Sequence, residues 1–434
     1  MTQRFIATPA TQVNGSIRVP GDKSISHRSV MLGGIAHGVT EVDGFLASAD
    51  CLATLRAQQM MGVHVERLSP TQLRVHGVGE RGLQAPAGEL DMGNAGTAIR
   101  LFMGLLSGQA FVSTLTGDES LRKRPMERVA KPLRLMGAHI DTLDGKPPVR
   151  IAPVTRLQSI DYALPMASAQ VKSAILLAAL NADGITRVSE PAPTRDHTER
   201  MFQDFGVLIG RDTGSVWLAG GQKLTAAPVS VPGDFSSAAF FLVAGALAGG
   251  SEFVIENVGV NPTRTGLLDI LRLMGADVRV HERGGAGAEP TADVSVRASQ
   301  LRGIHVPEAL VPLAIDEFPV LFIAAACATG ETLVTGAEEL RVKESDRLAV
   351  MAEGLTRLGI VNELLPDGIR IQGGQRFTGG HIDSHGDHRI AMAFAVASLR
   401  ADGDIHIDDV ENVATSFPDF LQVAAAAGLQ VRGA

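Results

Sequence analysis

The sequence contains few aromatic residues and few cysteines. Its 434 residues include one Trp, one Tyr and two Cys, and aromatic residues make up 4% of the chain. So little aromatic surface argues against a protein that stacks nucleic-acid bases. Cys51 and Cys327 lie in apolar stretches, a pattern that indicates buried reduced thiols and not a disulfide framework. We therefore expect a cytoplasmic protein.

Long apolar runs and an excess of positive charge are also missing. No apolar run approaches the ~18 residues of a membrane span, and the first 20 residues lack the apolar centre of a signal peptide. The formal net charge is −8, so we expect neither a membrane protein nor a nucleic-acid-binding surface. With 45% hydrophobic residues, the chain is long enough for two domains with separate cores.

An internal repeat covers the whole chain. An apolar helix that ends in Gly and is followed by a short apolar strand recurs six times, at Gly62, Gly137, Gly206, Gly275, Gly359 and Gly428. These helices alternate with a second type that is apolar on all sides, such as 174–179 and 391–397, and should be buried. Each repeat of about 70 residues therefore predicts strand, buried helix, strand, loop, outer helix and strand. Six such repeats form two α/β domains of three repeats each.

The domain boundary follows from a second repeated motif. Val19-Pro20-Gly21-Asp22-Lys23-Ser24 recurs at 231–236, with Phe235 in place of Lys23. We therefore expect one domain at 21–233 and a second that combines 1–20 with 234–434. The strands near 19–21 and 231–233 would form a hinge, and the cleft between the domains would be the ligand site.

Cations gather where helices begin. Asp22 is a suitable N-cap, Lys23 adds charge to the same helix N-terminus, and Arg28 shares a helix face with Ser24, so this segment favours anion binding. A polar loop also lies 11 to 15 residues before four of the repeat glycines. These loops supply Arg124, Arg195, Arg264 and the segment from Lys343 to Arg347. Arginines in equivalent loops predict recognition of carboxylate or phosphate.

Two other motifs are weaker. The segment 77–82 matches GxGxxG, but no long helix follows it, so we do not expect a dinucleotide site. His381, His385 and His388 with two aspartates could suggest a metal site. However, Asp387-His388-Arg389 occupies the helix-opening position of the sixth repeat, which capping and anion binding explain better. We expect no metal and no cofactor.

Six ordered motifs resemble the 5-enolpyruvylshikimate-3-phosphate (EPSP) synthase family. They are GDKSISHR (21–28), GNAGTAIR (93–100), KRP (123–125), PMASAQVKSAILLA (165–178), LRVKESDRL (340–348) and DHRIAM (387–392). The resemblance implies two inside-out α/β domains, each of three βαβαββ units, with the active site in the cleft between them. It also implies a transferase of the shikimate pathway to chorismate and aromatic amino acids. Such an enzyme moves the carboxyvinyl group of phosphoenolpyruvate to the 5-hydroxyl of shikimate 3-phosphate and is the target of glyphosate.

The resemblance also implies which residues form the site. The catalytic positions match Asp316, Glu344 and Lys23, although Asp316 could instead be a helix N-cap and Glu344 a salt-bridge partner. Positions for shikimate 3-phosphate match Lys23, Ser24, Arg28, Ser168, Gln170, Arg195, Asp316 and Lys343. Positions for phosphoenolpyruvate match Lys23, Gly96, Arg124, Gln170, Arg347 and Arg389. We expect both small molecules as substrates and a monomeric enzyme.

The chain departs from the family pattern at a few positions. Thr415 stands where some members have a Lys, so one phosphoenolpyruvate cation is absent or supplied elsewhere, and Ala169 replaces a Ser of those members. Gly96 lacks the methyl group associated with glyphosate tolerance, which predicts sensitivity. Two alternatives are an enolpyruvyl transferase acting on UDP-N-acetylglucosamine and a non-catalytic phosphometabolite-binding protein. The first usually has a Cys near 110–130, which is absent here; the second would need neither Asp316 nor Glu344.

Overall fold

The computed structural model describes residues 4–284 and 287–434. Each of the six repeat glycines follows a helix and has a positive φ, between 81° at Gly206 and 99° at Gly428. Glycine adopts this left-handed conformation without a steric penalty, and it lets the chain leave the helix and enter the next strand. The six predicted helix ends are confirmed.

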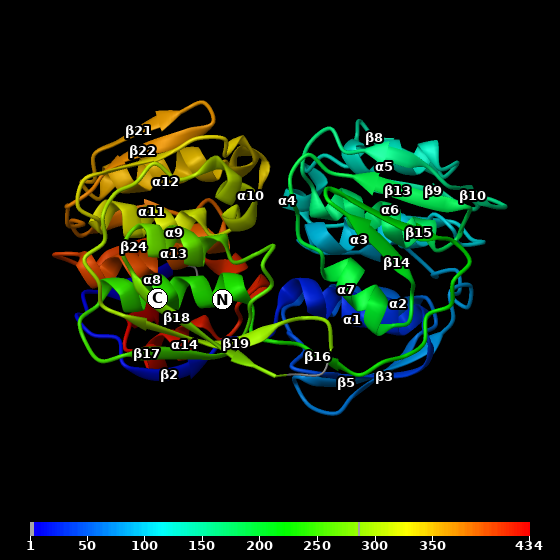
Figure 1. The fold of residues 1–434 in the computed structure, drawn as a ribbon, viewed down its shortest axis with the longest axis horizontal. Coiled ribbons are helices and arrows are strands. Elements are labelled where there is room, and N and C mark those ends of the chain that lie inside the picture. Colours follow the sequence, from blue (N-terminus) through cyan, green and yellow to red (C-terminus); the bar gives the residue numbers. More distant parts are fainter. Residues whose placement is uncertain (1–3, 285–286) are drawn as a thin grey trace. The chain divides into compact units, whose positions relative to one another are not determined.

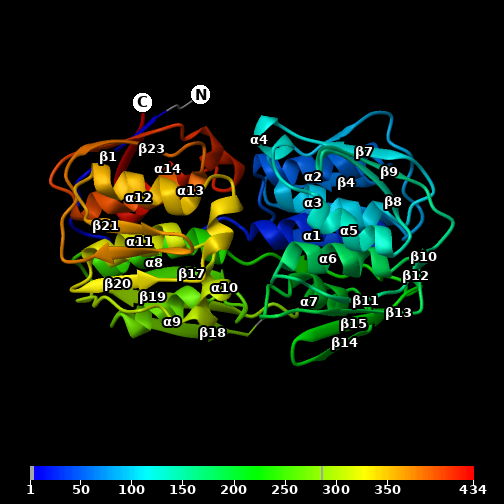
Figure 2. The same cartoon turned by 90° about the horizontal axis from the view of Figure 1, so that it is seen from above.

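The chain divides into two units (Figures 1 and 2). Unit 1 contains the described residues of 1–20, 232–285 and 290–434, and unit 2 those of 21–231 and 286–289. Each unit has a hydrophobic core of its own. The fold is the predicted α/β architecture.

Unit 2 contains three repeats. The first consists of α1 (Lys23–Ile35), β3 (His37–Asp43), α2 (Ala49–Met60), β4 (His64–Arg67) and β5 (Gln72–Val78), with β16 (Val229–Ser230) as its first strand. The second consists of β6 (Leu90–Asp91), α3 (Gly96–Leu106), β7 (Ser113–Thr116), α4 (Glu119–Arg122), α5 (Glu127–Leu135), β8 (His139–Leu143) and β9 (Lys146–Ala152). The third consists of β10 (Leu157–Gln158), β11 (Asp161–Ala163), α6 (Ala169–Ala179), β12 (Ala182–Asp183), β13 (Ile185–Ser189), α7 (His197–Asp204), β14 (Ile209–Asp212) and β15 (Ser215–Ala219).

Unit 1 repeats this plan. Its first repeat joins β2 (Gly15–Arg18) to α8 (Phe235–Leu247), β17 (Phe253–Gly259), α9 (Gly266–Leu273), β18 (Asp277–Arg283) and β19 (Thr291–Arg297). The next contains η1 (Glu308–Leu310), α10 (Val311–Ala314), α11 (Phe318–Cys327), β20 (Glu331–Val334), η2 (Glu338–Val342), α12 (Arg347–Arg357), β21 (Asn362–Leu365) and β22 (Gly368–Gln372). The last contains β23 (Gly380–Asp383), α13 (His388–Ala397), η3 (Ser398–Arg400), β24 (Ile405–Asp408), η4 (Glu411–Thr415), α14 (Phe420–Ala427), β25 (Gln430–Gly433) and β1 (Arg4–Thr8).

The sheets share one pairing scheme. In unit 2 their orders are β16-β3-β5-β4, β6-β7-β9-β8 and β11-β13-β15-β14, with β10-β12 as a separate pair. In unit 1 the orders are β18-β19-β17-β2, β20-β22-β21 and β23-β24-β1-β25. Every four-stranded sheet has one parallel pair, such as β6 with β7, and antiparallel pairs elsewhere. The strand directions and the intervening helices are those of a βαβαββ unit.

The helices of the second predicted type occupy the centre of each unit. In unit 1, α8, α11 and α13 pack on one another, and every residue of α8 is buried. In unit 2, α3 packs on α1 and α6. Several predicted site residues, such as Lys23, Gly96 and Arg389, lie at the N-termini of these helices. Within the described part of the chain, no helix has the length and apolar character that crossing a membrane requires.

Candidate active site

The first helix of unit 2 places Lys23 beside a buried carboxylate. Asp22 caps α1, and its Oδ1 accepts a hydrogen bond from the backbone N of Ile25 at 2.9 Å. Lys23 forms an ion pair with Asp50 from the first turn of α2. Asp50 is only 3% exposed, so the pair fixes the ammonium group at the mouth of α1. Asp50 was not among the residues predicted from the sequence.

Arg28 lies one turn further along α1 and is buried. Its Nε donates to Thr198 Oγ1 at 2.7 Å, its Nη2 to Ser173 Oγ at 3.0 Å and its Nη1 to the carbonyl of Ser24 at 3.0 Å. Burial lowers the pKa of Arg28 to about 10, and the positive charge of Arg195 adds to that effect. An anion near these two cations would stabilise both, because it would replace the lost solvation.

Gln170 connects α6 to α3. Its Oε1 accepts from Arg100 Nη1 at 2.5 Å, and its Nε2 donates to Thr97 Oγ1 at 3.0 Å. Ser168 is the N-cap of α6, and its Oγ accepts from the backbone N of Val171 at 3.4 Å. The structure thus brings the predicted Gln170 together with Arg100 and Thr97. Arg100 and Thr97 lie inside the motif GNAGTAIR, but Gln170 is about 70 residues away in sequence. Neither was therefore predicted as a site residue.

Gly96 allows Arg124 to approach α3 closely. Arg124 Nη2 donates to Asn94 Oδ1 at 2.6 Å and to Ser120 Oγ at 3.3 Å. A Cβ atom on Gly96 would lie 2.9 Å from Arg124 Nη1 and 3.4 Å from Arg100 Nη1. A side chain at position 96 would therefore press directly on two guanidinium groups.

A buried lysine supports the loop that carries Arg195. Lys172 Nζ lies 2.9 Å from Glu199 and 3.0 Å from Glu190, and it donates to the carbonyl of Thr194 at 3.3 Å. Burial acts to lower the pKa of Lys172, but the two carboxylates outweigh it and raise that pKa above its ordinary value. Lys172 therefore ties α6 to the residue directly before Arg195. Lys172 was not among the predicted site residues.

In unit 1, Arg347 is the centre of an ion-pair network. Its Nε lies 2.8 Å from Asp387 Oδ2, its Nη1 3.2 Å from Asp316 Oδ1 and its Nη2 2.6 Å from Glu344 Oε2. The Ser345 hydroxyl also donates to Asp387, at 3.1 Å. Both predicted catalytic carboxylates of this unit therefore contact one guanidinium group.

Two more predicted cations surround Asp316. Lys343 Nζ lies 3.5 Å from Asp316 Oδ1, and Arg389 Nη2 lies 4.0 Å from Oδ2. Arg389 Nη1 also donates to the carbonyl of Asp316 at 3.1 Å. Lys343 has a second carboxylate partner, Glu339, at 2.8 Å. Asp316 is thus enclosed by three cations.

Arg264, from the equivalent loop of the fourth repeat, belongs to a neighbouring chain of contacts. Its Nη2 donates to Ser236 Oγ at 2.5 Å, and Ser236 in turn donates to buried Glu317. Glu317 Oε1 lies 3.8 Å from Arg389 Nη1. Ser236 and Glu317 thus connect Arg264 to Arg389.

The residues at the starts of the helices agree with the sequence patterns at three positions and differ at one. Asp22 and Asp387 cap α1 and α13 as predicted, and Asp234 caps α8. The opening at 316–318 differs, because Glu317 occupies the N-cap position of α11 and its side chain makes no capping hydrogen bond. The alternative interpretation of Asp316 as an N-cap is wrong. Thr415, at the position of the missing Lys, ends η4 and donates to the carbonyl of Asn412 at 2.7 Å.

Comparisons with known proteins identify the family. The model of the family "EPSP synthase (3-phosphoshikimate 1-carboxyvinyltransferase)" matches residues 7–424. The chain belongs to the EPSP synthase family. A 3-phosphoshikimate 1-carboxyvinyltransferase of Methylococcus capsulatus is 59% identical over 428 residues, covering 98% of both chains. One of Alkalilimnicola ehrlichii is 57% identical over 426 residues, covering 98% of this chain and 96% of the relative. An EPSP synthase structure from Acinetobacter baumannii superimposes with a TM-score of 0.90 at 55% identity and covers 100% of both chains.

Proposed function

We propose that this chain transfers the carboxyvinyl group of phosphoenolpyruvate to the 5-hydroxyl of shikimate 3-phosphate and releases inorganic phosphate. It is a transferase of the shikimate pathway, which leads to chorismate and the aromatic amino acids. Family membership over almost the whole chain supports the reaction. The observation that carries the chemistry is Asp316, a carboxylate enclosed by Lys343, Arg347 and Arg389.

The reaction proceeds by an addition followed by an elimination, and both steps require proton transfer. In the addition, the 5-hydroxyl oxygen bonds to C2 of phosphoenolpyruvate, the hydroxyl proton leaves, and a proton adds to the C3 methylene. In the elimination, the new methyl group loses a proton, the C2–O bond to phosphate breaks, and the enol ether forms as inorganic phosphate departs. An acid and a base must therefore face one carbon centre among cations that stabilise anionic groups.

Asp316 is our candidate for the group that accepts the hydroxyl proton. The three surrounding cations compensate its negative charge. Glu344, in contact with Arg347, is our candidate for the methylene and methyl protons. Lys23, oriented by Asp50, would share in proton transfer between the two substrates.

The remaining predicted residues hold the anionic groups. Arg28 and Arg195, with Lys343, would bind shikimate 3-phosphate, while Arg124, Arg347 and Arg389 would bind phosphoenolpyruvate. Arginine suits both because its planar donors match carboxylate and phosphate oxygens in pairs. Gln170 would serve both substrates, and its contact with Arg100 fixes its amide orientation.

Four further predictions belong to this proposal. The domain limits near 21 and 233 and the hinge strands at 19–21 and 231–233 follow from the repeated Val-Pro-Gly-Asp motif, and the position of the site between the domains follows from this boundary and from the family resemblance. A monomeric, cytoplasmic enzyme that binds no nucleic acid is the fourth. Sedimentation equilibrium checks the oligomeric part, since a mass of one chain is expected with and without substrates.

Phosphate release is the decisive test. The purified chain is mixed with phosphoenolpyruvate and either shikimate 3-phosphate or UDP-N-acetylglucosamine, and inorganic phosphate is followed. We expect release with shikimate 3-phosphate alone. Asp316→Asn should lower kcat by at least a hundredfold, whereas Asp402→Asn, at a 62%-exposed surface pair, should leave it unchanged. Release with the nucleotide sugar alone would overturn the proposal, and binding without release would favour a non-catalytic protein.

A further inference from the structure

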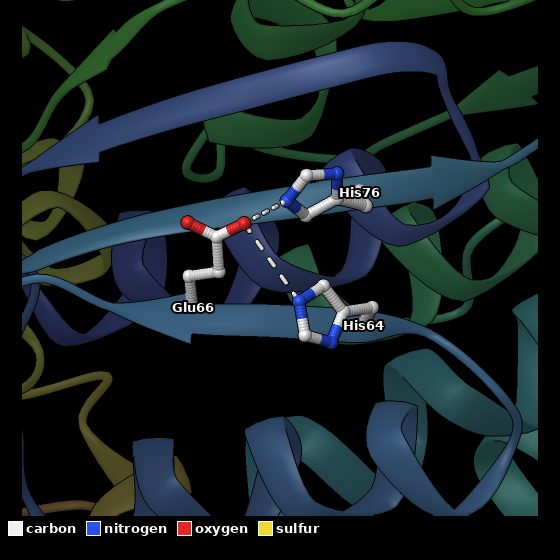
Figure 3. Close-up of side chains that lie close together, drawn as sticks. All are labelled: His64, Glu66 and His76. Atoms are coloured by element: carbon white, nitrogen blue, oxygen red, sulfur yellow. Dashed lines mark hydrogen bonds and ion pairs between the residues drawn. The ribbon is translucent and has the colours of Figure 1, made fainter.

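Two histidines and a glutamate gather at the edge of one sheet of unit 2. In β4, Val65 faces the core, so His64 and Glu66 point to the opposite, outer face. In the antiparallel pairing of β4 with β5, His76 lies directly opposite His64. Figure 3 shows the three side chains turned toward one another. None of them belongs to the proposed substrate or catalytic residues.

The spacing of the three side chains suits a metal ion. One ligand atom from each lies within 4.8 Å of the other two. His76 Nε2 is 2.7 Å and His64 Nε2 is 3.7 Å from the same Glu66 oxygen, Oε1. Ligand atoms bound at 2.0–2.1 Å to a tetrahedral zinc ion lie about 3.3 Å apart. The two distances bracket this value, so small side-chain rotations bring all three atoms onto one ion.

Strand pairing preorganises the site. The backbone register fixes His64 and His76 as opposite neighbours, and their ring centroids are 4.9 Å apart. Glu66 shares the outer face two residues after His64. Because three ligands come from two hydrogen-bonded strands, binding an ion orders only side chains. Among the described residues, this is the one group of three His, Cys, Asp or Glu side chains with such spacing.

Arg74 is the nearest competing cation that this face supplies. It lies opposite Glu66 in the same pairing. Its Nε contacts Glu41 at 3.2 Å, and its Nη1 is 4.0 Å from the other Glu66 oxygen, Oε2. Arg74 therefore engages Oε2 and leaves Oε1 directed at the two imidazoles.

We propose that His64, Glu66 and His76 bind one divalent transition-metal ion, with Zn²⁺ as the best match. Two imidazole nitrogens and one carboxylate oxygen suit zinc, whereas Mg²⁺ and Ca²⁺ prefer sets of oxygen ligands. The bound ion would link edge strand β4 to β5. It would stabilise unit 2 and restrict pairing of the exposed edge with other chains.

Calorimetry on the full-length protein tests the proposal. The protein is treated with EDTA, transferred to metal-free buffer and titrated with ZnCl₂. We expect one site in the micromolar range that His64→Ala and His76→Ala each weaken at least tenfold. His139→Ala, which removes an exposed strand histidine of β8, should leave the affinity unchanged. Titration with MgCl₂ should produce no saturable binding.

Two further measurements connect binding to the site. A Zn²⁺ concentration of one hundred times Kd should raise the thermal midpoint of the parent by roughly 5 °C and that of the two variants by much less. With Cu²⁺ as the probe, electron paramagnetic resonance should show coupling to two imidazole nitrogens. The side chain of His64 is 71% exposed, so His64→Ala should fold like the parent, and an equal midpoint without metal verifies this. No saturable Zn²⁺ binding, or equal affinity in the parent and both variants, would overturn the proposal.

Discussion

Asp387 holds the guanidinium of Arg347 with both carboxylate oxygens: Nε lies 2.8 Å from Oδ2, and Nη2 lies 3.3 Å from Oδ1. The side chain of Arg347 is 1% exposed and that of Asp387 is 0% exposed. Asp387 Oδ1 also accepts from the backbone N of Arg389 at 3.0 Å. Burial acts to lower the pKa of Arg347, but the charges of Asp387, Glu344 and Asp316 outweigh it and raise that pKa. Asp387 thus orients the guanidinium of Arg347 and caps the helix turn that carries Arg389, the other residue proposed to bind phosphoenolpyruvate in unit 1.

Asp387→Asn should damage stability and phosphoenolpyruvate binding together. The amide keeps an oxygen for the helix cap but removes the charge that compensates Arg347. Breaking a buried ion pair costs about 3 kcal/mol or more, which urea denaturation followed by circular dichroism would measure. KM for phosphoenolpyruvate should rise at least tenfold. Asp346→Asn is the matched control, since Asp346 caps α12 but pairs with Arg341 at a 37%-exposed position. An Asp387→Asn protein as stable as that control would contradict the argument.

Arg124→Ala and Arg389→Ala should each raise KM for phosphoenolpyruvate at least tenfold. The reason is the loss of a charge-assisted hydrogen bond, which contributes roughly 1.5–3 kcal/mol. Arg134→Ala provides the comparison, because Arg134 forms an exposed pair with Glu127 on α5 and such pairs contribute little. Steady-state rates at varied phosphoenolpyruvate give the answer. An unchanged saturation curve for either variant would remove that arginine from the site.

The repeat architecture was predictable because its signals are local. A glycine that ends a helix with positive φ, or an all-apolar helix after an Asp N-cap, depends on a few consecutive residues. The predicted N-cap at Asp22 is confirmed, and Asp234 in the repeated Val-Pro-Gly-Asp also caps its helix. The same expectation failed at 316–318, where α10 and a following turn occupy the space before α11. Asp316 lies in that turn, and its carboxylate contacts cations instead of the helix.

Contacts between distant segments were not predictable. Lys23 pairs with Asp50, and Gln170 with Arg100, only because the folding of the intervening strands and helices places these distant segments side by side. Hydrophobic periodicity predicts that such elements exist but does not specify which polar side chains meet. The pair His64 and His76 shows the same limit, since their contact depends on the register of one hairpin. A one-residue shift would place one histidine on the opposite face.

Glyphosate should inhibit the parent enzyme, and Gly96→Ala should weaken that inhibition. The added methyl group would lie 2.9 Å from Arg124 Nη1, and Asn94 restrains that guanidinium at 2.6 Å. We expect at least a tenfold higher inhibition constant and a smaller increase in KM for phosphoenolpyruvate. Gly88→Ala is the control, because a Cβ there meets nothing within 4 Å. Full parental activity in millimolar glyphosate at limiting phosphoenolpyruvate would refute the sensitivity expected from Gly96.

Lys172→Met should affect shikimate 3-phosphate more than phosphoenolpyruvate. The substitution keeps the side-chain length but leaves Glu190 and Glu199 without their shared cation, and it releases the carbonyl of Thr194 beside Arg195. We expect KM for shikimate 3-phosphate to rise at least fivefold, with KM for phosphoenolpyruvate changing less than twofold. Lys131→Met, at an exposed position of α5, serves as control. A purely structural role would change both constants equally.

The same variant tests the electrostatic role of Lys172 in stability. Uncompensated buried carboxylates should lower the free energy of unfolding by about 3 kcal/mol. Because the folded state raises the pKa of Lys172 above its ordinary value of 10.5, the unfolded chain releases this proton first as the pH rises. The contribution of Lys172 is therefore complete below about pH 10.5 and is lost as the pH passes through the folded-state pKa. The stability difference between parent and Lys172→Met should stay constant from pH 7 to pH 10 and shrink above that range. A difference that already shrinks between pH 7 and pH 9 would mean that another group controls the cluster.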